Sequence, residues 1–199
     1  MALCEKLINA CISADCDNPV FTGIQSKAYI FNKAEVEGFT YDSDNGNIVT
    51  AISMASGKKG YAVNQLGKTP FTGTQTELVE GNFGNTFTNT VSFLVPDNSA
   101  TASHDILDML ANGKFMVIIA NEYTGSDNKS RWQIFGAKKG LTCTGLTCEK
   151  YSEDNMGGWA VTLTEEGAPQ SGTFLYVEGQ GGADGTITYL ATITDECTE

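Results

Sequence analysis

The sequence predicts a mainly β fold with one short helix against the sheet. The chain of 199 residues contains 22 Gly, only 4 Pro and 41% hydrophobic residues. Its apolar residues fall in short runs between turn sequences, and several runs alternate apolar with polar side chains, which is typical of strands with one buried face. A chain of this length suits one domain and buries roughly 70% of its unfolded surface.

The stretch from Ser103 to Leu141 organises the predicted fold. A short helix should begin at Ser103, a good N-cap, and end at Asn112-Gly113, because Gly takes the left-handed conformation without a Cβ clash. Helical spacing predicts one apolar face, formed by Ile106, Leu107 and Leu110. This helix should therefore lie on the sheet.

A strand should follow the helix directly. Residues 115–120 are continuously apolar and rich in β-branched side chains, which predicts a strand buried on both faces. A tight turn and a second strand, 131–136, come next. The remaining predicted strands are 27–40, 48–54, 77–95, 159–164, 174–177 and 187–193, and Asn45-Gly46 predicts the hairpin turn between the first two.

The first 18 residues are set apart from this pattern. In residues 1–18, Leu3, Leu7, Ile8 and Ile12 recur at near-helical spacing, and the residue before Pro19 disfavours a helix. Two interpretations stay open: a packed N-terminal turn or short helix, and an arm that docks on a neighbouring subunit. The remaining range, 19–199, is expected to form a single β-rich domain.

The chain is strongly acidic, with a formal net charge of -12. Such a chain should repel nucleic acid and anionic membranes. The charge has two possible roles: solubility alone, or a surface to which DNA does not adhere. No apolar run approaches transmembrane length and the first residues do not form a signal peptide, so we expect the chain to fold in a cytoplasm.

The sequence gives little support for catalysis or for a metal site. Its only histidine, His104, lies between Ser103 and Asp105, and adjacent residues on one helical turn should point apart rather than form a triad. The acidic pair Glu165-Glu166 lies in turn-like sequence and is expected to be solvated. We therefore expect neither an enzyme, nor a cofactor, nor a bound metal.

The chain contains six cysteines. Without a secretory context, free thiols are the favoured interpretation. Disulfides and an all-thiolate metal site remain the alternatives. The cysteines are Cys4, Cys11, Cys16, Cys143, Cys148 and Cys197.

Residues 56–76 are polar, rich in Gly and predicted to form a long loop. Loops of this length inside compact domains are usually functional or mobile. Three lysines make it locally basic in an acidic chain, which favours contact with an acidic surface such as another copy of the protein; an ordinary solvated loop is the alternative. The candidate subunit-interface residues are Lys58, Lys59, Tyr61, Gln65, Lys68 and Phe71.

Residues 80–170 contain a strand, an acidic connector, a short helix and further strands in a distinctive order. The segments are T-V-S-F-L-V, H-D-I-L-D-M-L, F-M-V-I-I-A-N-E-Y, R-W-Q-I-F-G, G-L-T and G-G-W-A-V-T-L-T-E-E-G-A-P. In this order of segments, the chain resembles the tail tube and tail hub proteins of tailed phages.

This resemblance implies a β-sandwich or small barrel with one flanking helix, as in type VI secretion tube proteins. It further implies a structural virion protein of the phage tail, assembled in the host bacterial cytoplasm. Its partners would be further copies of itself, in rings that are often hexameric and stack into a tube, and other tail proteins. DNA would pass through without specific binding. The competing hypothesis is a β-sandwich binding module or surface adhesin for a glycan or a protein.

Overall fold

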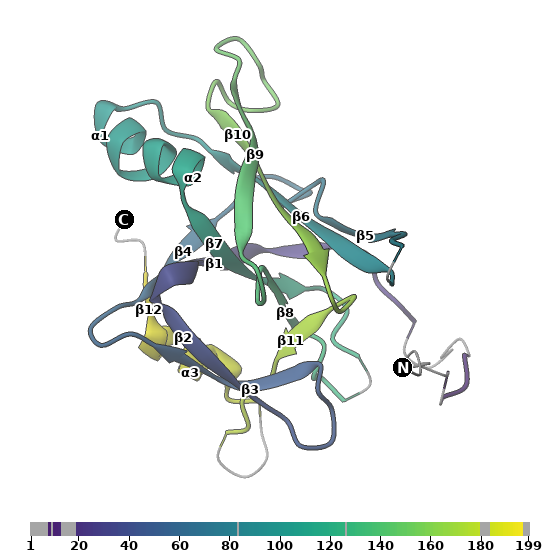
Figure 1. Cartoon of the computed structure of the whole chain (residues 1–199). Coiled ribbons are helices and arrows are strands. Elements are labelled where there is room, and N and C mark those ends of the chain that lie inside the picture. Colours follow the sequence, from purple (N-terminus) through teal and green to yellow (C-terminus); the bar gives the residue numbers. More distant parts are fainter. Residues whose placement is uncertain are drawn as a thin grey trace.

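The computed structural model describes residues 8, 10–12, 19–82, 84–125, 127–179 and 184–196. The fold is mainly β, as predicted, and its strands join in one large mixed sheet (Figure 1). The strands are β1 (Ile24–Asn32), β2 (Val36–Tyr41), β3 (Ile48–Met54), β4 (Gly60–Asn64), β5 (Gln75–Val79), β6 (Thr86–Val95), β7 (Lys114–Asn121), β8 (Trp132–Phe135), β9 (Leu141–Cys148), β10 (Trp159–Ala168), β11 (Thr173–Leu175) and β12 (Thr194–Asp195).

The helical segments are few and short. They are the 3-10 turn η1 (Lys33–Glu35), α1 (Ala100–Ala102), the π-helical turn η2 (Ser103–Leu107), α2 (Asp108–Asn112) and α3 (Thr186–Ile193). The turn η1 divides the predicted strand 27–40 into β1 and β2. None of the helices in the described ranges is long and apolar enough to cross a membrane.

The sheet runs in the order β2-β3-β11-β8-β7-β9-β10-β6-β5, and β7 lies at its centre. One edge of β7 pairs with β1. The start of β7 pairs with β9 and its later part pairs with β8. Through β1, the sheet continues to β4 and β12. The predicted hairpin at Asn45-Gly46 joins β2 to β3 in antiparallel pairing.

Strand β7 is buried on both faces, which confirms the prediction for 115–120. Its alternate side chains Phe115, Val117 and Ile119 enter one hydrophobic core with β6, β10 and the helix α1–α2. Met116, Ile118 and Ala120 enter a second core with β3, β8 and α3. The period of two along a strand therefore makes this one element the shared wall of two cores.

The helix after β6 begins earlier than predicted. Ser99, not Ser103, is its N-cap, because the Ser99 side chain accepts a hydrogen bond from the Ala102 N–H at 3.1 Å. Leu107 and Leu110 are buried as expected, whereas Ile106 is 42% exposed. The π-helical turn widens the repeat at this point, and the spacing for an ideal α-helix no longer places Ile106 against the sheet.

The end of this helix also differs from the prediction. Gly113 is extended, with φ -88° and ψ 175°, rather than left-handed. Glycine is still required there, because a Cβ atom would collide with the ring of Phe115 and with the Met109 carbonyl. Glycine is therefore needed at this position because neighbouring atoms approach its Cα closely, and not because φ is positive.

The prediction of a strand at 187–193 is wrong, because Thr186–Ile193 form helix α3. Thr186, Leu190 and Thr194 are buried, and their spacing of four is helical. The Tyr189 hydroxyl accepts from the Ile52 N–H at 2.7 Å and donates to the Ile52 carbonyl at 2.8 Å, so α3 is fixed to β3.

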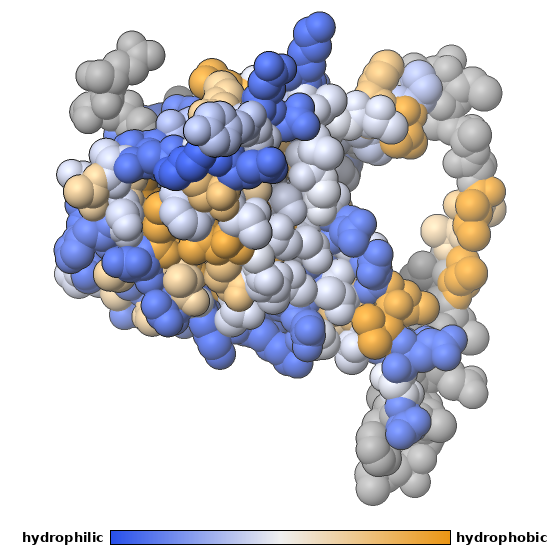
Figure 2. Space-filling view, turned by 90° about the horizontal axis from the view of Figure 1, so that it is seen from above, coloured by the Kyte–Doolittle hydropathy of each residue, from blue (hydrophilic) through white to orange (hydrophobic). Residues whose placement is uncertain are grey.

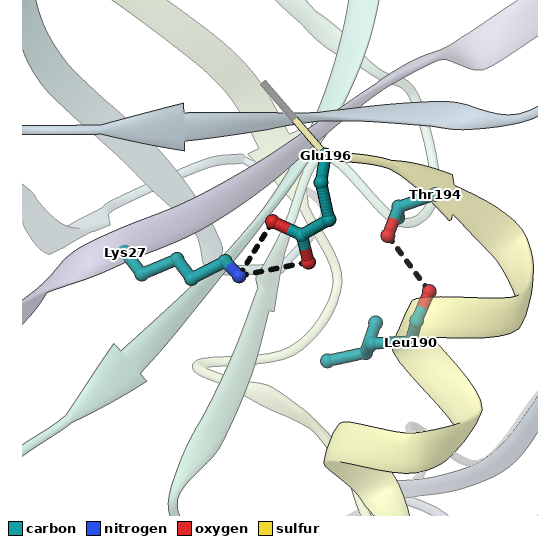
Figure 3. A network of polar contacts seen from close by, with 4 residues as sticks. All are labelled: Lys27, Leu190, Thr194 and Glu196. Carbon is teal, nitrogen blue, oxygen red and sulfur yellow. Dashed lines mark hydrogen bonds and ion pairs between the residues drawn. The ribbon is translucent and has the colours of Figure 1, made fainter. Parts of the chain in front are cut away.

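The segment after α3 is anchored at two points (Figure 3). The Thr194 hydroxyl donates to the Leu190 carbonyl at 2.8 Å. The Lys27 ammonium binds both carboxylate oxygens of Glu196, at 2.7 and 2.8 Å. That bond is the main cause of a raised pKa of Lys27. Together these contacts hold β12 beside β4.

The predicted N-terminal arm, 1–18, lies almost wholly outside the described residues. Of its described side chains, Ile8 and Ile12 are 80% and 90% exposed, and neither lies in a helix. The thiols of Cys11, Cys143 and Cys148 are free, and the other three cysteines fall outside the described ranges.

Candidate functional site

Part of the predicted loop 56–76 is ordered as a strand. Strand β4 occupies 60–64 and pairs with β1, so the irregular connection to β5 covers only 65–74. Y-A-V alternates too briefly to distinguish a strand from a loop, and its pairing partner β1 lies about 30 residues earlier. The prediction of one long loop over 56–76 is therefore wrong.

Three side chains pin the connection 65–74 to the body. Gln65 is buried; its Nε2 donates to the Leu94 carbonyl at 2.8 Å, and its Oε1 accepts from the Leu94 N–H at 2.7 Å. The Thr74 hydroxyl accepts from the Ser92 N–H at 3.3 Å. Phe71 is 3% exposed and enters the first core, with a positive φ of 57°.

These contacts correct part of the predicted interface. Gln65 and Phe71 hold the subunit together and are not available on its surface. Lys58 and Lys59 form ion pairs within the chain, with Glu35 at 3.1 Å and Asp195 at 2.9 Å. Tyr61, which is 56% exposed, and Lys68 remain on the surface, and no carboxylate partner is seen for Lys68 among the described residues.

A pocket of about 680 Å³ lies beneath this connection. Its apolar floor is formed by Phe71, Ile119 and Phe135, and its polar lining includes Lys68 and Gln133 among several threonines. Pockets that hold small molecules have volumes of about 300–1,000 Å³ and combine apolar walls with a few polar groups. The pocket therefore has the size and lining of a ligand site.

The main path of the sheet ends in two strands, β2 and β5, with one unpaired edge each, and the two-residue strand β12 ends the branch through β4. In the part of the chain that the structure describes, β2 pairs only with β3, and β5 pairs only with β6. The two strands lie on opposite sides of the molecule (Figure 1). On β5, Leu78 and Val79 are exposed. An unpaired edge offers a row of backbone donors and acceptors to another chain.

A cluster of four lysines, which we call the lysine cluster, surrounds the turn between β8 and β9. A Cβ atom on Gly140 would lie 3.1 Å from the Lys33 side chain and 3.3 Å from that of Lys114. Lys138 and Lys139 immediately precede this glycine and are exposed. The lysine cluster is Lys33, Lys114, Lys138 and Lys139.

Aromatic rings of β2 hold part of the lysine cluster. The Lys33 ammonium lies 5.0 Å from the Phe39 ring centroid. The Lys138 ammonium lies 4.7 Å from the Tyr41 centroid and donates to its hydroxyl at 2.8 Å. Burial lowers the pKa of Lys33, and the charge of Lys138 lowers it further, against the opposing effect of Glu165. The adjacent lysines in A-K-K-G were the only sequence signal for this cluster.

The expectation that Glu165 is solvated is wrong. This residue lies in β10 and is 3% exposed. Its carboxylate accepts from the Lys139 N–H at 2.8 Å, from the Gly136 N–H at 3.1 Å and from the Asn89 amide at 3.1 Å. Glu165 therefore fixes the turn that carries Lys138 and Lys139, whereas its neighbour Glu166 is exposed.

The hairpin between β9 and β10 protrudes from the body (Figure 1). Its carboxylates Glu149, Glu153 and Asp154 are exposed, as are Tyr151 at 98% and Met156 at 53%. Figure 2 shows the molecule from that side, where several apolar patches lie among hydrophilic side chains. We call Glu149, Tyr151, Glu153, Asp154 and Met156 of this hairpin the acidic tip.

The side chains of His104 and Asp105 do not point apart as predicted. His104 Nδ1 lies 2.6 Å from Asp105 Oδ1, and this hydrogen bond is the main cause of the raised pKa of His104. Both side chains are largely exposed. Among the described residues, no group of three or more His, Cys, Asp or Glu side chains is arranged to hold a metal ion.

Comparisons of this chain with protein-family models, with curated proteins and with solved structures gave no match.

Proposed function

We propose that this chain is a structural subunit that assembles into rings, and that the rings stack into a phage tail tube or tail hub through which DNA passes. The observation that carries the proposal is the pair of unpaired edges, β2 and β5, on opposite sides of one sheet. A contact between two different surfaces repeats from copy to copy and closes into a ring when the rotation allows it.

Strand addition is the physical basis of this contact. Backbone hydrogen bonds between β5 of one copy and β2 of the next would extend the sheet around the ring. The exposed Leu78 and Val79 would become buried in such a contact. The resemblance to tail tube proteins makes a hexamer the ring we propose, with other tail proteins as partners and the virion tail as the location.

The net charge of -12 supports the same proposal. Copies arranged around a pore place many acidic side chains near its wall, and a narrow pore focuses their field. Phosphate groups that approach the wall would be repelled, so DNA would move along the axis without binding.

The edge contact can be tested with Leu78→Lys combined with Val79→Lys. Lysines on an edge strand oppose strand addition, so this variant should remain a monomer while the wild type forms rings or tubes by negative-stain microscopy and native mass spectrometry. Ile187→Lys is the control, because Ile187 is 50% exposed on α3 and belongs to neither edge strand. A wild type that stays monomeric at all concentrations would overturn the proposal.

The 680 Å³ pocket favours a second candidate, a binding module for a glycan. Its amide and hydroxyl groups above an aromatic floor suit a neutral, polyhydroxylated ligand. A stable monomer that binds glycans on an array, and that loses this binding on Gln133→Ala, would support this candidate over the ring.

A further inference from the structure

The lysine cluster has an unusual charge environment for this protein. The chain carries 24 acidic residues against 12 Lys and Arg. Lys27, Lys58 and Lys59 each have a carboxylate partner. In the ranges that the structure describes, no ion pair with a carboxylate is seen for any of the four clustered lysines, although Lys139 donates to the Glu166 carbonyl at 3.0 Å.

Grouping four cations costs free energy unless an anion approaches them. Lys33 shows this cost, since burial and the neighbouring ammonium of Lys138 disfavour its charged form. The buried carboxylate of Glu165 compensates the positive charge of the cluster only in part, because its oxygens already accept hydrogen bonds from three N–H groups. A carboxylate from outside the subunit would therefore stabilise the charged form of these lysines.

The acidic tip has the opposite character. No ion pair is seen for Glu149, Glu153 or Asp154 among the described residues, although Lys150 is adjacent to Glu149 in the sequence. Tyr151 is 98% exposed and touches little of its own subunit. Aromatic rings already lie against Lys33 and Lys138, so a further ring would find a favourable cationic surface there.

Strand β9 keeps the two surfaces apart. Its eight residues connect the turn at Gly140 with the protruding hairpin. An extended strand of this length spans about 26 Å, at ~3.3 Å per residue. The acidic tip therefore cannot reach the lysine cluster of its own chain, but the tip of a second copy can.

We propose that the acidic tip of one copy docks on the lysine cluster of the next, and that this contact joins successive rings. The inference rests on the proposed function and assigns it a second contact, distinct from the strand edges within a ring. It commits to a second copy of this chain because the two surfaces have complementary charge and occur once each on every subunit. Their difference makes the contact head to tail, so the stack has a direction.

A charge swap tests the contact. The cluster variant is Lys114→Glu with Lys139→Glu, which leaves in place the two lysines that lie against the rings of β2. The tip variant is Glu153→Lys with Asp154→Lys. The cluster variant has two lysines and two glutamates in the cluster, which therefore has no net charge, and the tip variant has a positive tip that faces a positive cluster. In either variant alone the charge complementarity is lost, and the concentration needed to form stacks should rise at least about tenfold. In an equimolar mixture the unaltered tip of one variant meets the unaltered cluster of the other, and at the second contact the introduced lysines meet the introduced glutamates, so stacks of alternating subunits should return.

Sedimentation velocity and negative-stain microscopy would measure this. Lys68→Glu with Lys129→Glu is the control for the cluster variant, because it changes the net charge equally at sites outside the cluster. Glu122→Lys with Glu178→Lys is the equivalent control for the tip variant, because both residues are exposed and lie outside the edge strands. Circular dichroism checks that each variant is folded, and single rings should persist in both variants.

The outcomes separate the two proposals. Stacks formed normally by either variant, or a mixture that does not recover, would overturn the tip contact while leaving the rings intact. Equal loss in the control variants would also overturn it, because net charge alone would then govern stacking. A wild type that forms no rings at any concentration would overturn both the proposed function and this contact.

Discussion

At the scale of single residues, Glu165 is the clearest stabilising group. Glu165→Ala would leave the N–H groups of Gly136 and Lys139 and the amide of Asn89 without their acceptor in a buried site. We expect a loss of roughly 2–4 kcal/mol in the free energy of unfolding, measured by urea denaturation. Glu166→Ala is the adjacent control and should change stability by no more than about 0.5 kcal/mol. Equal effects would contradict this role.

Glu165 also shows what a sequence conceals. E-E-G-A-P reads as a solvated turn, and two adjacent glutamates give no sign that one of them is buried. Alternation along β10 places Glu165 on the same face as Val161 and Leu163. The donors that make its burial possible come from Asn89 and from the turn after β8, which are distant in sequence. Such convergence cannot be read from a local pattern.

The titration of Lys33 should report on docking. In the single subunit, burial and Lys138 lower its pKa from the usual 10.5. A lowered lysine pKa means that the folded state disfavours the charge, a cost that is relieved as pH rises through the folded-state pKa. A docked carboxylate should raise this pKa in the assembly, which NMR of labelled lysine can measure. Lys27 is the control, with a raised pKa in both states; an unchanged Lys33 would contradict docking.

At the scale of elements, the sequence predicted secondary structure best where the apolar residues followed a single clear pattern. The alternation in β6 and β10 and the apolar run of β7 identified those strands. In 187–193, Ile and Thr favour strands and alternate by chance, whereas the deciding contacts of Leu190 and Tyr189 are tertiary. The predictions of one loop over 56–76 and of Gln65 and Phe71 as interface residues were wrong for a similar reason. The pairing of β4 with β1 and the core position of Phe71 depend on distant segments.

Helix α3 can be distinguished from a strand by two substitutions at one exposed position. Ala191 lies in the middle of α3 and is exposed. Ala191→Gly should destabilise the protein by roughly 0.5–1 kcal/mol, and Ala191→Val by a few tenths, because both disfavour a helix. Thermal unfolding would measure both. A stabilising Ala191→Val would contradict the helix, because valine favours strands.

The helix α1–α2 should depend on one face only. Leu110 is 4% exposed in the first core, whereas Met109 is 54% exposed. Leu110→Ala should lower the free energy of unfolding by roughly 2–5 kcal/mol, through lost burial and a residual cavity. Met109→Ala is the matched control and should have a small effect. Chemical denaturation compares the two, and similar values would mean that the helix is not docked through Leu110.

At the scale of the whole molecule, the acidic balance should govern contact with DNA. We expect assembled particles not to retain duplex DNA at ~0.05 M salt, where electrostatic binding is strongest, because each copy carries a net charge of -12. Gel mobility of labelled DNA would test this. Basic substitutions at acidic positions that face the pore should then slow DNA release without affecting assembly. Unchanged release would mean that the charge serves solubility only.

The pairing of distant strands affects how the chain is made. Strand β3 ends at Met54, yet its partner β11 begins only at Thr173, and β1 pairs with β7 about 90 residues later. At ~5–20 residues per second, the ribosome needs roughly 6–24 s between completing β3 and reaching β11. During that interval one side of the nascent sheet is open to other chains. A truncated product that ends before β11 would keep this side open permanently, and aggregation would be its natural fate.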